Sequence, residues 1–312
     1  MPSPAEIEDA ARALREGRLV AFPTETVYGL GADATNGHAV AEVYAAKGRP
    51  AFNPLIVHVA SATQAFDLGQ FPDAARRLAL AGWPGPLSIV VPRAPDCPVS
   101  LLASAGLDSI ALRVPAHPVA LALLQATARP VVAPSANPSG RVSPTSADHV
   151  RRHLGGKVAM ILDGGRCRVG VESSVVSFLD DGPKLLRPGG MPRAEIEAII
   201  GMPLTVEAHS QRPHAPGQLS SHYAPRAELR LNAGEPRAGE AYLGFGALHA
   251  HGPYNLSARG DLVEAAAALF GLLHEIDATG VARIAVAPVP HHGLGEAIND
   301  RLLRAAAPRG AP

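Results

Sequence analysis

The sequence has 312 residues, of which 47% are hydrophobic and only 4% aromatic, so it can build a substantial core mainly from Ala, Val, Leu and Ile. Its 28 basic and 28 acidic residues balance, which argues against bulk electrostatic binding to nucleic acid or an anionic membrane, but not against a local basic patch. Because the first residues lack the pattern of a signal peptide and no apolar run approaches the roughly 20 residues of a membrane span, we expect a cytoplasmic protein without a membrane partner.

Helix and strand patterns alternate along the first two thirds of the chain. A helix is expected to begin at the cap signature of residues 3–6 and to end at Gly17, and further helices are expected over 40–46, 72–81, 118–126, 146–154 and 193–200. Short apolar runs predict strands at 19–22, 53–59, 87–91, 110–114, 130–133, 160–162, 174–178 and 184–186. This interleaving indicates the α/β class with a mixed sheet.

The composition changes after residue 205. Residues 209–225 are polar, rich in His, Pro, Ser and Gly, and have no apolar period, which is typical of a linker or a functional loop. Beyond them, strand patterns at 229–231, 241–245 and 284–286 alternate with helix patterns at 262–277 and 298–306. We therefore expect a domain over residues 1–205, a linker or lid over 206–227 and a smaller α/β unit over 228–312.

Polar clusters follow many of the predicted strands. Residues 22–31 lead from an apolar strand into a turn dense in hydroxyls and glycines, and a short helix pattern then delivers Lys47 and Arg49. Similar clusters at the ends of other strands supply Thr24, Thr26, Asn53, His58, Arg113, Ser135, Asn137, Ser143, Glu172, Ser173 and Arg187. Any one cluster is more simply explained as a turn or a cap. Together, at strand ends and with four cations, they favour a site for a polyanionic ligand.

Other familiar sites find little support in the sequence. There is no phosphate-loop motif, and the glycines at 244–246 reach His249 where a dinucleotide fingerprint needs glycine. His149 and His153 lie one helical turn apart and could share a metal, but no third ligand is evident, so a solvated helix face is preferred. Cys167 lies between two arginines, yet nothing marks it as a nucleophile, and a structural or incidental role is preferred.

Seven motifs, taken in order, resemble the YrdC/Sua5 family of threonylcarbamoyl-AMP synthases: PTETVYGL (23–30), KGRP (47–50), NPL (53–55), WPGPL (83–87), LRVP (112–115), APSANPSG (133–140) and LRPG (186–189). Residues 215–217, 221–225 and 293–302 resemble the linker and C-terminal domain of the longer Sua5 type. The resemblance covers nearly the whole chain and implies a YrdC-like twisted mixed sheet with flanking helices, followed by a smaller Rossmann-like domain. Residues 217–222 depart from the family because they lack basic or aromatic residues before the His222–Tyr223 pair.

The resemblance also implies a reaction, in which L-threonine, bicarbonate or CO2, and ATP give threonylcarbamoyl-adenylate and pyrophosphate. The product would pass to the tRNA threonylcarbamoyl transferase machinery for N6-threonylcarbamoylation of tRNA adenosine 37, and the enzyme would be a nucleotidyltransferase. A carbamate oxygen must attack the α-phosphorus, a step that needs positioning and charge neutralisation more than a covalent nucleophile. Mg2+ would accompany ATP, bound mainly through phosphate oxygens rather than protein ligands.

Residue roles follow from the same resemblance. Lys47 and Arg49 would be the catalytic pair. ATP would be held by Arg49, Asn53, Ser109, Ser135, Asn137, Ser143, Arg187 and Tyr223. Threonine would be framed by Thr26, His58, Arg113, Ala133 and Ser173, with Arg113 as the partner of its carboxylate. The linker would fold over the site as a lid, with His222 or Tyr223 touching the nucleotide. Glu25 and Tyr28 receive no role from the sequence.

Two rival functions stay open. A YrdC-type fold can present a concave basic surface, so the chain could be a module for double-stranded RNA or tRNA. Neutral net charge and the lack of basic–aromatic interleaving weigh against this as the main role, although a weak RNA contact is retained as an expectation. Within enzymes, the rival is a carbamoyl-adenylate step that serves an acceptor other than threonine.

Overall fold

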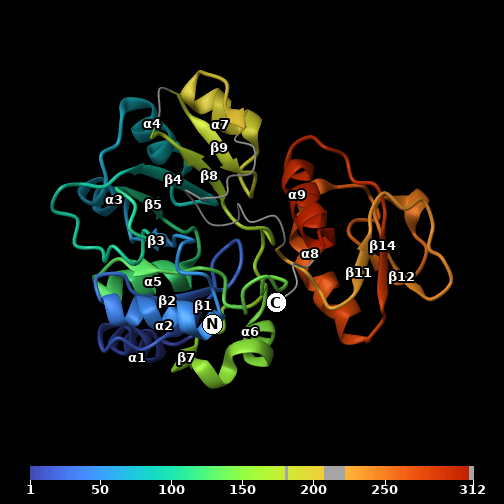
Figure 1. The fold of residues 1–312 in the computed structure, drawn as a ribbon, viewed down its shortest axis with the longest axis horizontal. Helices are drawn as coiled ribbons and strands as arrows, with labels where there is room; N and C mark the ends of the chain where they lie inside the picture. The colour runs from blue at the N-terminus through green and yellow to red at the C-terminus, as the bar shows by residue number, and fades with distance from the viewer. Residues whose placement is uncertain (180–181, 207–221, 309–312) are drawn as a thin grey trace.

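Two sheets organise the chain (Figure 1). The computed structural model describes residues 1–179, 182–206 and 222–308. Within them, the first sheet has the strand order β10-β9-β8-β4-β5-β3-β6-β2-β1-β7, and the second has the order β11-β14-β12-β13. The first sheet mixes parallel and antiparallel neighbours, whereas every pairing in the second is parallel. The expected α/β class, with a mixed sheet and a smaller second unit, is confirmed. The exact domain limits stay a prediction.

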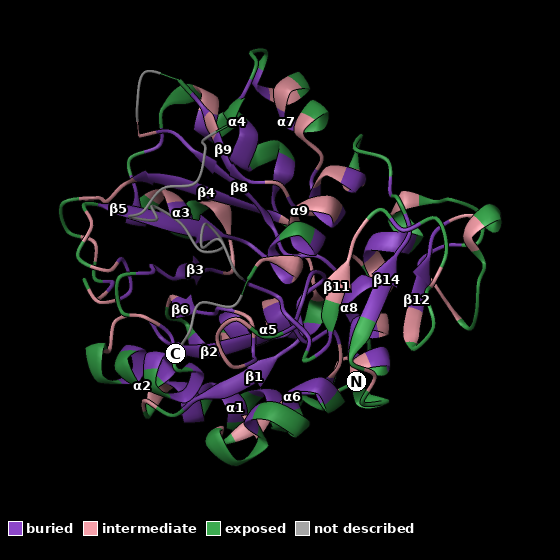
Figure 2. Cartoon of the chain, turned by 45° about the vertical axis from the view of Figure 1, so that its right-hand side comes forward, coloured by how far each residue is buried: buried purple, intermediate pink, exposed green. Residues whose placement is uncertain are grey.

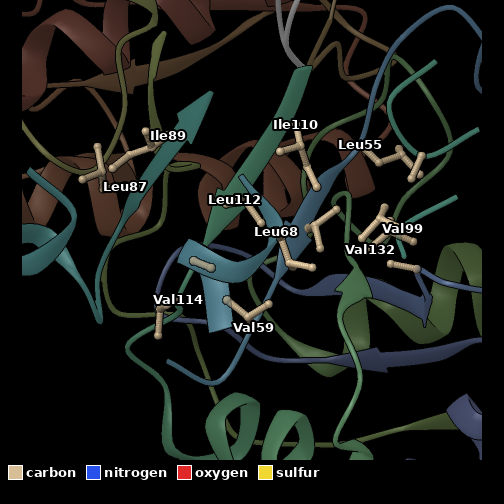
Figure 3. Close-up of a cluster of buried hydrophobic side chains, with 14 of the residues drawn as sticks. Leu55, Val59, Leu68, Leu87, Ile89, Val99, Ile110, Leu112, Val114 and Val132 are labelled. Atoms are coloured by element: carbon tan, nitrogen blue, oxygen red, sulfur yellow. The ribbon is translucent and has the colours of Figure 1, made fainter. Parts of the chain in front are cut away.

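The strands of the first sheet are short and mostly buried. They are β1 (Val20–Phe22), β2 (Gly29–Asp33), β3 (Ile56–His58), β4 (Leu87–Pro92), β5 (Ser109–Arg113), β6 (Val131–Val132), β7 (Met160–Ile161), β8 (Ser174–Ser177), β9 (Lys184–Arg187) and β10 (Thr205–Val206). Figure 3 shows part of the core, where side chains on or beside β3, β4, β5 and β6 meet Leu68 from a flanking helix.

Helices cover this sheet and expose their outer faces to solvent (Figure 2). They are α1 (Pro4–Arg15), α2 (Gly37–Lys47), α3 (Ala62–Leu68), α4 (Asp73–Gly82), α5 (Pro118–Thr127), α6 (Ala147–Leu154) and α7 (Arg193–Ile200). The predicted start of α1 is confirmed, because the Ser3 hydroxyl accepts from the Glu6 N–H and the Glu6 carboxylate accepts from the Ser3 N–H. Ser146 likewise caps α6, and Gly201 ends α7 in the left-handed conformation.

One sequence interpretation was wrong at the opening motif. The sequence predicts that residues 29–31 belong to a glycine-rich turn, but they begin β2, which pairs with β1 so that Val20 lies opposite Gly31. A Cβ at Gly31 would lie 2.8 Å from Cε1 of Phe22, so glycine is needed here for close packing rather than for a turn. The sequence also missed α3 and the two-residue strands β10 and β13, which are too short for a periodic pattern.

The second sheet contains β11 (Glu228–Arg230), β12 (Glu240–Gly244), β13 (Tyr254–Asn255) and β14 (Arg283–Val286). Helices α8 (Leu262–Ala278) and α9 (Leu294–Ala306) lie between this sheet and the first domain (Figure 1). Val27, Val142 and Val171 of the first domain belong to the same buried apolar cluster as these helices, so the two parts share a packed interface. In the described part of the chain, no helix has the length and apolarity that crossing a bilayer requires.

Candidate active site

A cavity that is partly open to solvent lies at the ends of strands of the first sheet. Strand pairing explains the convergence. Parallel strands β3 and β5 place His58 opposite Arg113, and antiparallel strands β8 and β9 place Arg187 opposite Val175, close to Ser173. The residues that line the cavity are Thr26, Val27, Arg49, Ile56, His58, Arg113, Ala133, Pro134, Ser135, Glu172, Ser173, Arg187, His222 and Tyr223.

The opening motif forms one wall of this cavity by pairing its backbone with the loop that follows β6. Leu30 N–H donates to the Pro134 carbonyl at 2.7 Å, and Ala136 N–H donates to the Tyr28 carbonyl at 2.8 Å. The Tyr28 hydroxyl donates to the Gly165 carbonyl at 2.8 Å and accepts from Gly164 N–H. Tyr28, which had no role from the sequence, therefore fastens a distant loop behind the motif.

Thr24 and Thr26 order the turn itself. The Thr24 hydroxyl donates to the Val27 carbonyl at 2.6 Å and lies 2.8 Å from the Thr26 hydroxyl. Both threonines are buried. Their hydroxyls are therefore fixed in place, and Thr26 faces the cavity.

Arg113 at the end of β5 forms a buried ion pair with Glu25. Its Nη2 donates to Glu25 Oε1 at 2.7 Å and its Nε to the Gly85 carbonyl at 3.2 Å, while Nη1 has no hydrogen-bond partner in the described chain. Glu25 Oε2 accepts from Ala116 N–H at 3.1 Å. Sequence reasoning missed this function of Glu25, because its partner Arg113 lies 88 residues away along the chain.

His58 is held as a neutral ring beside Arg113. Burial, with a further contribution from Arg113, lowers the pKa of His58 to about 3. Nδ1 lies 3.2 Å from the Ile56 carbonyl and therefore carries the proton, which leaves Nε2 as a hydrogen-bond acceptor. The lining of the cavity thus offers an acceptor next to the Arg113 guanidinium.

Lys47 lies behind the cavity wall. Its Nζ donates to the carbonyls of Ser135 at 2.5 Å and Asn137 at 2.6 Å, so it joins α2 to the loop after β6. Burial lowers the pKa of Lys47 well below its ordinary value, and Arg49 lowers it further while Glu172 opposes them. The contact joins the KGRP motif (47–50) to the APSANPSG motif (133–140).

Two further arginines line the same cavity as Arg113. Arg49 donates from Nε to the Asn53 carbonyl and from Nη2 to the Pro54 carbonyl. Burial lowers the pKa of Arg49 to about 10, so it is still charged at neutral pH. Arg187 donates from Nε and Nη2 to the Ser173 carbonyl, at 3.1 and 2.7 Å. These anchors fix the direction of both guanidinium groups.

Two buried amide oxygens beside this group have no hydrogen-bond partner among the residues that the structure describes. They are Oδ1 of Asn53 and Oδ1 of Asn137, whose residues are no more than 1% exposed. Asn137 Nδ2 is satisfied by the Arg141 carbonyl at 2.8 Å. Buried acceptors are rarely left unsatisfied, so these two positions are suited to a ligand that donates hydrogen bonds.

Glu172 was not assigned a role by the sequence, yet it lines the cavity. Its Oε1 accepts from the Ser143 hydroxyl at 2.5 Å, and its Oε2 accepts from Nε of Arg301 at 2.7 Å. Burial raises the pKa of Glu172, but Arg301, Arg187 and the Ser143 hydrogen bond outweigh burial and lower it overall. The carboxylate is therefore ionised and engaged on both oxygens.

His222 and Tyr223 close another side of the cavity. Their rings meet edge to face at 4.3 Å, and His222 N–H donates to the Arg304 carbonyl in α9 at 3.2 Å. Burial lowers the pKa of His222 to about 3. The rest of the proposed lid, residues 207–221, lies outside the described residues.

The predicted site residues thus occupy three kinds of place. Those on the cavity surface are Arg49, Ser135, Arg187, Tyr223, Thr26, His58, Arg113, Ala133 and Ser173. Those behind it are Lys47, Asn53, Asn137 and Ser143, which contact its walls. Ser109 lies at the start of β5, whereas Arg113 lies at its end. Ser109 lines a separate small depression with Pro54 and Ala111. Their roles toward ligands stay predictions.

Neither of the other two sequence candidates offers chemistry. His149 is buried rather than on a solvated face, and its ring stacks on His274 of α8 at 3.9 Å, which corrects the earlier interpretation. Within residues 1–179, 182–206 and 222–308, no group of three His, Cys, Asp or Glu side chains could hold a metal ion. Cys167 is buried, and burial raises the pKa of its thiol, in keeping with a structural role.

The fold and site define an α/β protein with a strand-end cavity that three arginines line. Residues 12–189 match the Sua5–YciO–YrdC family model, described as "Telomere recombination", and residues 191–307 match the threonylcarbamoyl-AMP synthase C-terminal domain. The chain belongs to this family. The threonylcarbamoyl-AMP synthase of Bacillus subtilis is 43% identical to it, over 97% of this chain and 94% of that protein.

Solved structures agree with the assignment. Pyrococcus abyssi Sua5 complexed with L-threonine is 41% identical, with a TM-score of 0.90 over 98% of this chain and 95% of that chain. Escherichia coli YciO, at 22% identity and a TM-score of 0.56 over 61% of this chain and 91% of that chain, shares the fold of the first domain. The predicted YrdC-like fold and the predicted class of enzyme, a nucleotidyltransferase, are confirmed by these relatives.

Proposed function

We propose that this chain is a threonylcarbamoyl-AMP synthase, which joins L-threonine, bicarbonate or CO2, and ATP to give threonylcarbamoyl-adenylate and pyrophosphate. The observation that carries the proposal is that three arginines line one cavity. Arg113 lies beside the His58 acceptor, whereas Arg49 is close enough to Arg187 for their charges to interact. An amino acid and a nucleotide that must react with each other need such neighbouring sites.

Threonine binds at the Arg113 end in this proposal. Glu25 and Gly85 fix the guanidinium plane and leave Nη1 directed to a ligand carboxylate. His58 Nε2, Thr26 and Ser173 can then hydrogen-bond the amino acid's polar groups. The L-threonine complex of Pyrococcus abyssi Sua5, a full-length relative, supports threonine as the substrate.

ATP binds at the other end. Arg49 and Arg187 line the cavity and offset phosphate charge. Behind its wall, Asn53 and Asn137 anchor Arg49 and Lys47 through their carbonyls. Lys47 acts on phosphate binding indirectly. Its Nζ donates to the carbonyls of Ser135 and Asn137 and so orients the loop that contains them. In-line attack by a carbamate oxygen on the α-phosphorus then releases pyrophosphate, with these cations neutralising the charge that develops.

Mg2+ enters this proposal with ATP rather than as a resident metal. Both carboxylates at the cavity are already paired, Glu25 with Arg113 and Glu172 with Arg301. The residues therefore fit a Mg2+ ion held through phosphate oxygens, where it would offset charge on the triphosphate. A cytoplasmic location, delivery of the product to the tRNA threonylcarbamoyl transferase machinery for adenosine 37, and a weak tRNA contact stay predictions from the sequence.

The proposal is tested by pyrophosphate release from ATP measured with one component omitted at a time. Release that requires both threonine and bicarbonate supports the proposal. Release that is independent of threonine, or none with tight binding of double-stranded RNA instead, contradicts it. Replacing threonine by serine, or bicarbonate by carbamoyl phosphate, distinguishes threonylcarbamoylation from a carbamoyl-adenylate step that serves another acceptor.

A further inference from the structure

Arg301 of α9 extends from the C-terminal domain to the back wall of the cavity. It is 1% exposed, although it carries a full charge. Its Nε donates to Glu172 Oε2 at 2.7 Å, and its Nη1 donates to the Pro188 carbonyl at 3.0 Å. Glu172 precedes Ser173, and Pro188 follows Arg187. One side chain therefore holds two cavity-lining segments of the first domain.

The same guanidinium also contacts the linker and its own helix. Its carbon lies 5.0 Å from the centre of the Tyr223 ring, in a cation–π arrangement. Asp300 Oδ2 accepts from Nη1 at 2.5 Å, and Asp300 Oδ1 accepts from Arg304 Nε at 2.9 Å. Arg301 is thus the point where the catalytic sheet, the end of the linker and α9 meet.

The charge of Glu172 makes this contact matter for a polyanionic ligand. Glu172 lines the cavity, and an unpaired carboxylate there would repel phosphates. Arg301 supplies the compensating charge, and the Ser143 hydroxyl occupies the other carboxylate oxygen at 2.5 Å. Breaking a buried pair by removing one partner is costly, because the remaining charge is left without compensation.

Stability alone does not explain why this arginine is buried. Its Nη2 has no hydrogen-bond partner in the described part of the chain, and an unsatisfied buried donor is unfavourable. Buried ion pairs also contribute little to stability compared with packed apolar residues. A second cross-domain pair through α9, Arg193 with Glu296 at 2.6 Å, is partly exposed and contacts no cavity-lining residue in the described chain. The domains thus have a simpler means of docking.

We propose that Arg301 is a positioning residue, supplied by the C-terminal domain, that neutralises Glu172 and holds Ser143 and Arg187 in place for the nucleotide. The inference rests on the proposed function, and it predicts that the nucleotide end of the cavity is incomplete without α9. The threonine end, at Arg113, is anchored within the first domain by Glu25 and Gly85 and depends less on Arg301.

The test compares Arg301→Met, the double variant Arg301→Met/Glu172→Gln, and the control Arg193→Met in the full-length protein. For Arg301→Met we expect kcat/KM for ATP to fall by at least about 30-fold, the size expected when one partner of a buried charge pair is lost. KM for threonine should change less than the ATP parameters do. Removing the stranded charge with Glu172→Gln should recover about tenfold or more of that loss. Arg193→Met should stay within about twofold of the parent protein.

Three results would overturn the inference. They are an unchanged kcat/KM for ATP in Arg301→Met, a double variant no better than the single one, or an equal loss in Arg193→Met. If Arg301→Met does not fold, Arg301→Lys replaces it. Because Lys keeps the charge and loses the planar fork, we expect an intermediate ATP defect, and parent-like kinetics would count against the inference. If the parent protein releases no pyrophosphate, the proposed function fails by itself. Direct titration of Mg-ATP binding to the same variants then decides the inference about Arg301.

Discussion

The charged pairs at the cavity differ in burial from the pair that joins β11 to β14 in the second sheet. At the cavity of the first sheet, Arg113 and Glu25 have side chains 5% and 1% exposed, and Arg301 and Glu172 have side chains 0% and 9% exposed. On the second sheet, Arg283 and Glu228 are 67% and 81% exposed, and their closest atoms are 3.7 Å apart.

The difference shows which charges serve the site. Exposed pairs contribute about 0 to 1 kcal/mol and can be lost without consequence. Buried pairs need a reason beyond stability, because desolvation offsets most of their attraction. In this protein both buried pairs lie at the cavity wall, since Arg113 and Glu172 line the cavity and Glu25 and Arg301 are their partners. A buried pair that can be removed without loss of activity, or an exposed pair that cannot, would contradict this distinction.

Lys47→Met should have the largest effect. It removes a buried cation and leaves the carbonyls of Ser135 and Asn137 without their donor, so we expect kcat/KM for ATP to fall by at least about 100-fold. Steady-state pyrophosphate release measures this. Lys157 is a matched control, because it also donates to a backbone carbonyl, that of Ala46, but stands away from the cavity. A comparable loss in Lys157→Met would show that the effect reflects anchoring of α2.

Arg113→Lys should have the second-largest effect on activity. The charge is kept, but the planar fork between Glu25 and the ligand is lost, so KM for threonine should rise by about 10- to 100-fold while KM for ATP changes little. Steady-state kinetics with threonine and ATP varied in turn give the two KM values. Equal changes in both constants would contradict the carboxylate assignment. Arg129→Lys is the control, since Arg129 pairs with buried Asp33 but is itself 45% exposed.

A smaller effect is expected on the pH dependence of stability, through the stacked rings of His149 and His274 between the domains. Burial lowers the pKa of His274 to about 4 and that of His149 to about 3. His149 Nδ1 accepts from Thr145 N–H, and His274 Nε2 donates to the Ser143 carbonyl, so both rings are neutral when folded. As pH falls from about 6.5 toward 4, the unfolded chain binds protons that the folded chain does not, and stability falls.

His274→Gln should reduce this acid sensitivity, because glutamine keeps a donor for Ser143 and does not titrate. Between about pH 7.5 and 5, the parent protein should lose about 2 kcal/mol more unfolding free energy than the variant. Urea unfolding at the two pH values measures the difference. Equal losses in both proteins would mean that the histidine stack does not carry the pH dependence.

The smallest effect is expected at the exposed pair of the second sheet. Arg283→Ala removes the contact with Glu228, and unfolding free energy should change by no more than about 0.5 kcal/mol. Activity should be unchanged. Thermal or urea unfolding, together with pyrophosphate release, provides the check, and a large loss in either would remove the distinction between buried and exposed pairs.

Local patterns predicted most of the helices and the longer strands, because capping signals and apolar periods are written in neighbouring residues. They also indicated which residues follow the strands, and many of these line one cavity. Long-range partners could not be predicted in the same way. Glu25 meets Arg113 across 88 residues, and Glu172 meets Arg301 across 129. The burial of His149 depends on α8, which its own helix pattern cannot reveal.

We propose that this cavity joins threonine, bicarbonate and ATP into one adenylate. Mass spectrometry of the product formed from 13C-bicarbonate, L-threonine and Mg-ATP by the full-length protein tests this directly. We expect an adenylate that contains both threonine and the 13C label, and that is lost when either substrate is omitted or when Lys47 is replaced by Met. An adenylate without the label, or pyrophosphate release with no threonine in the product, would contradict it.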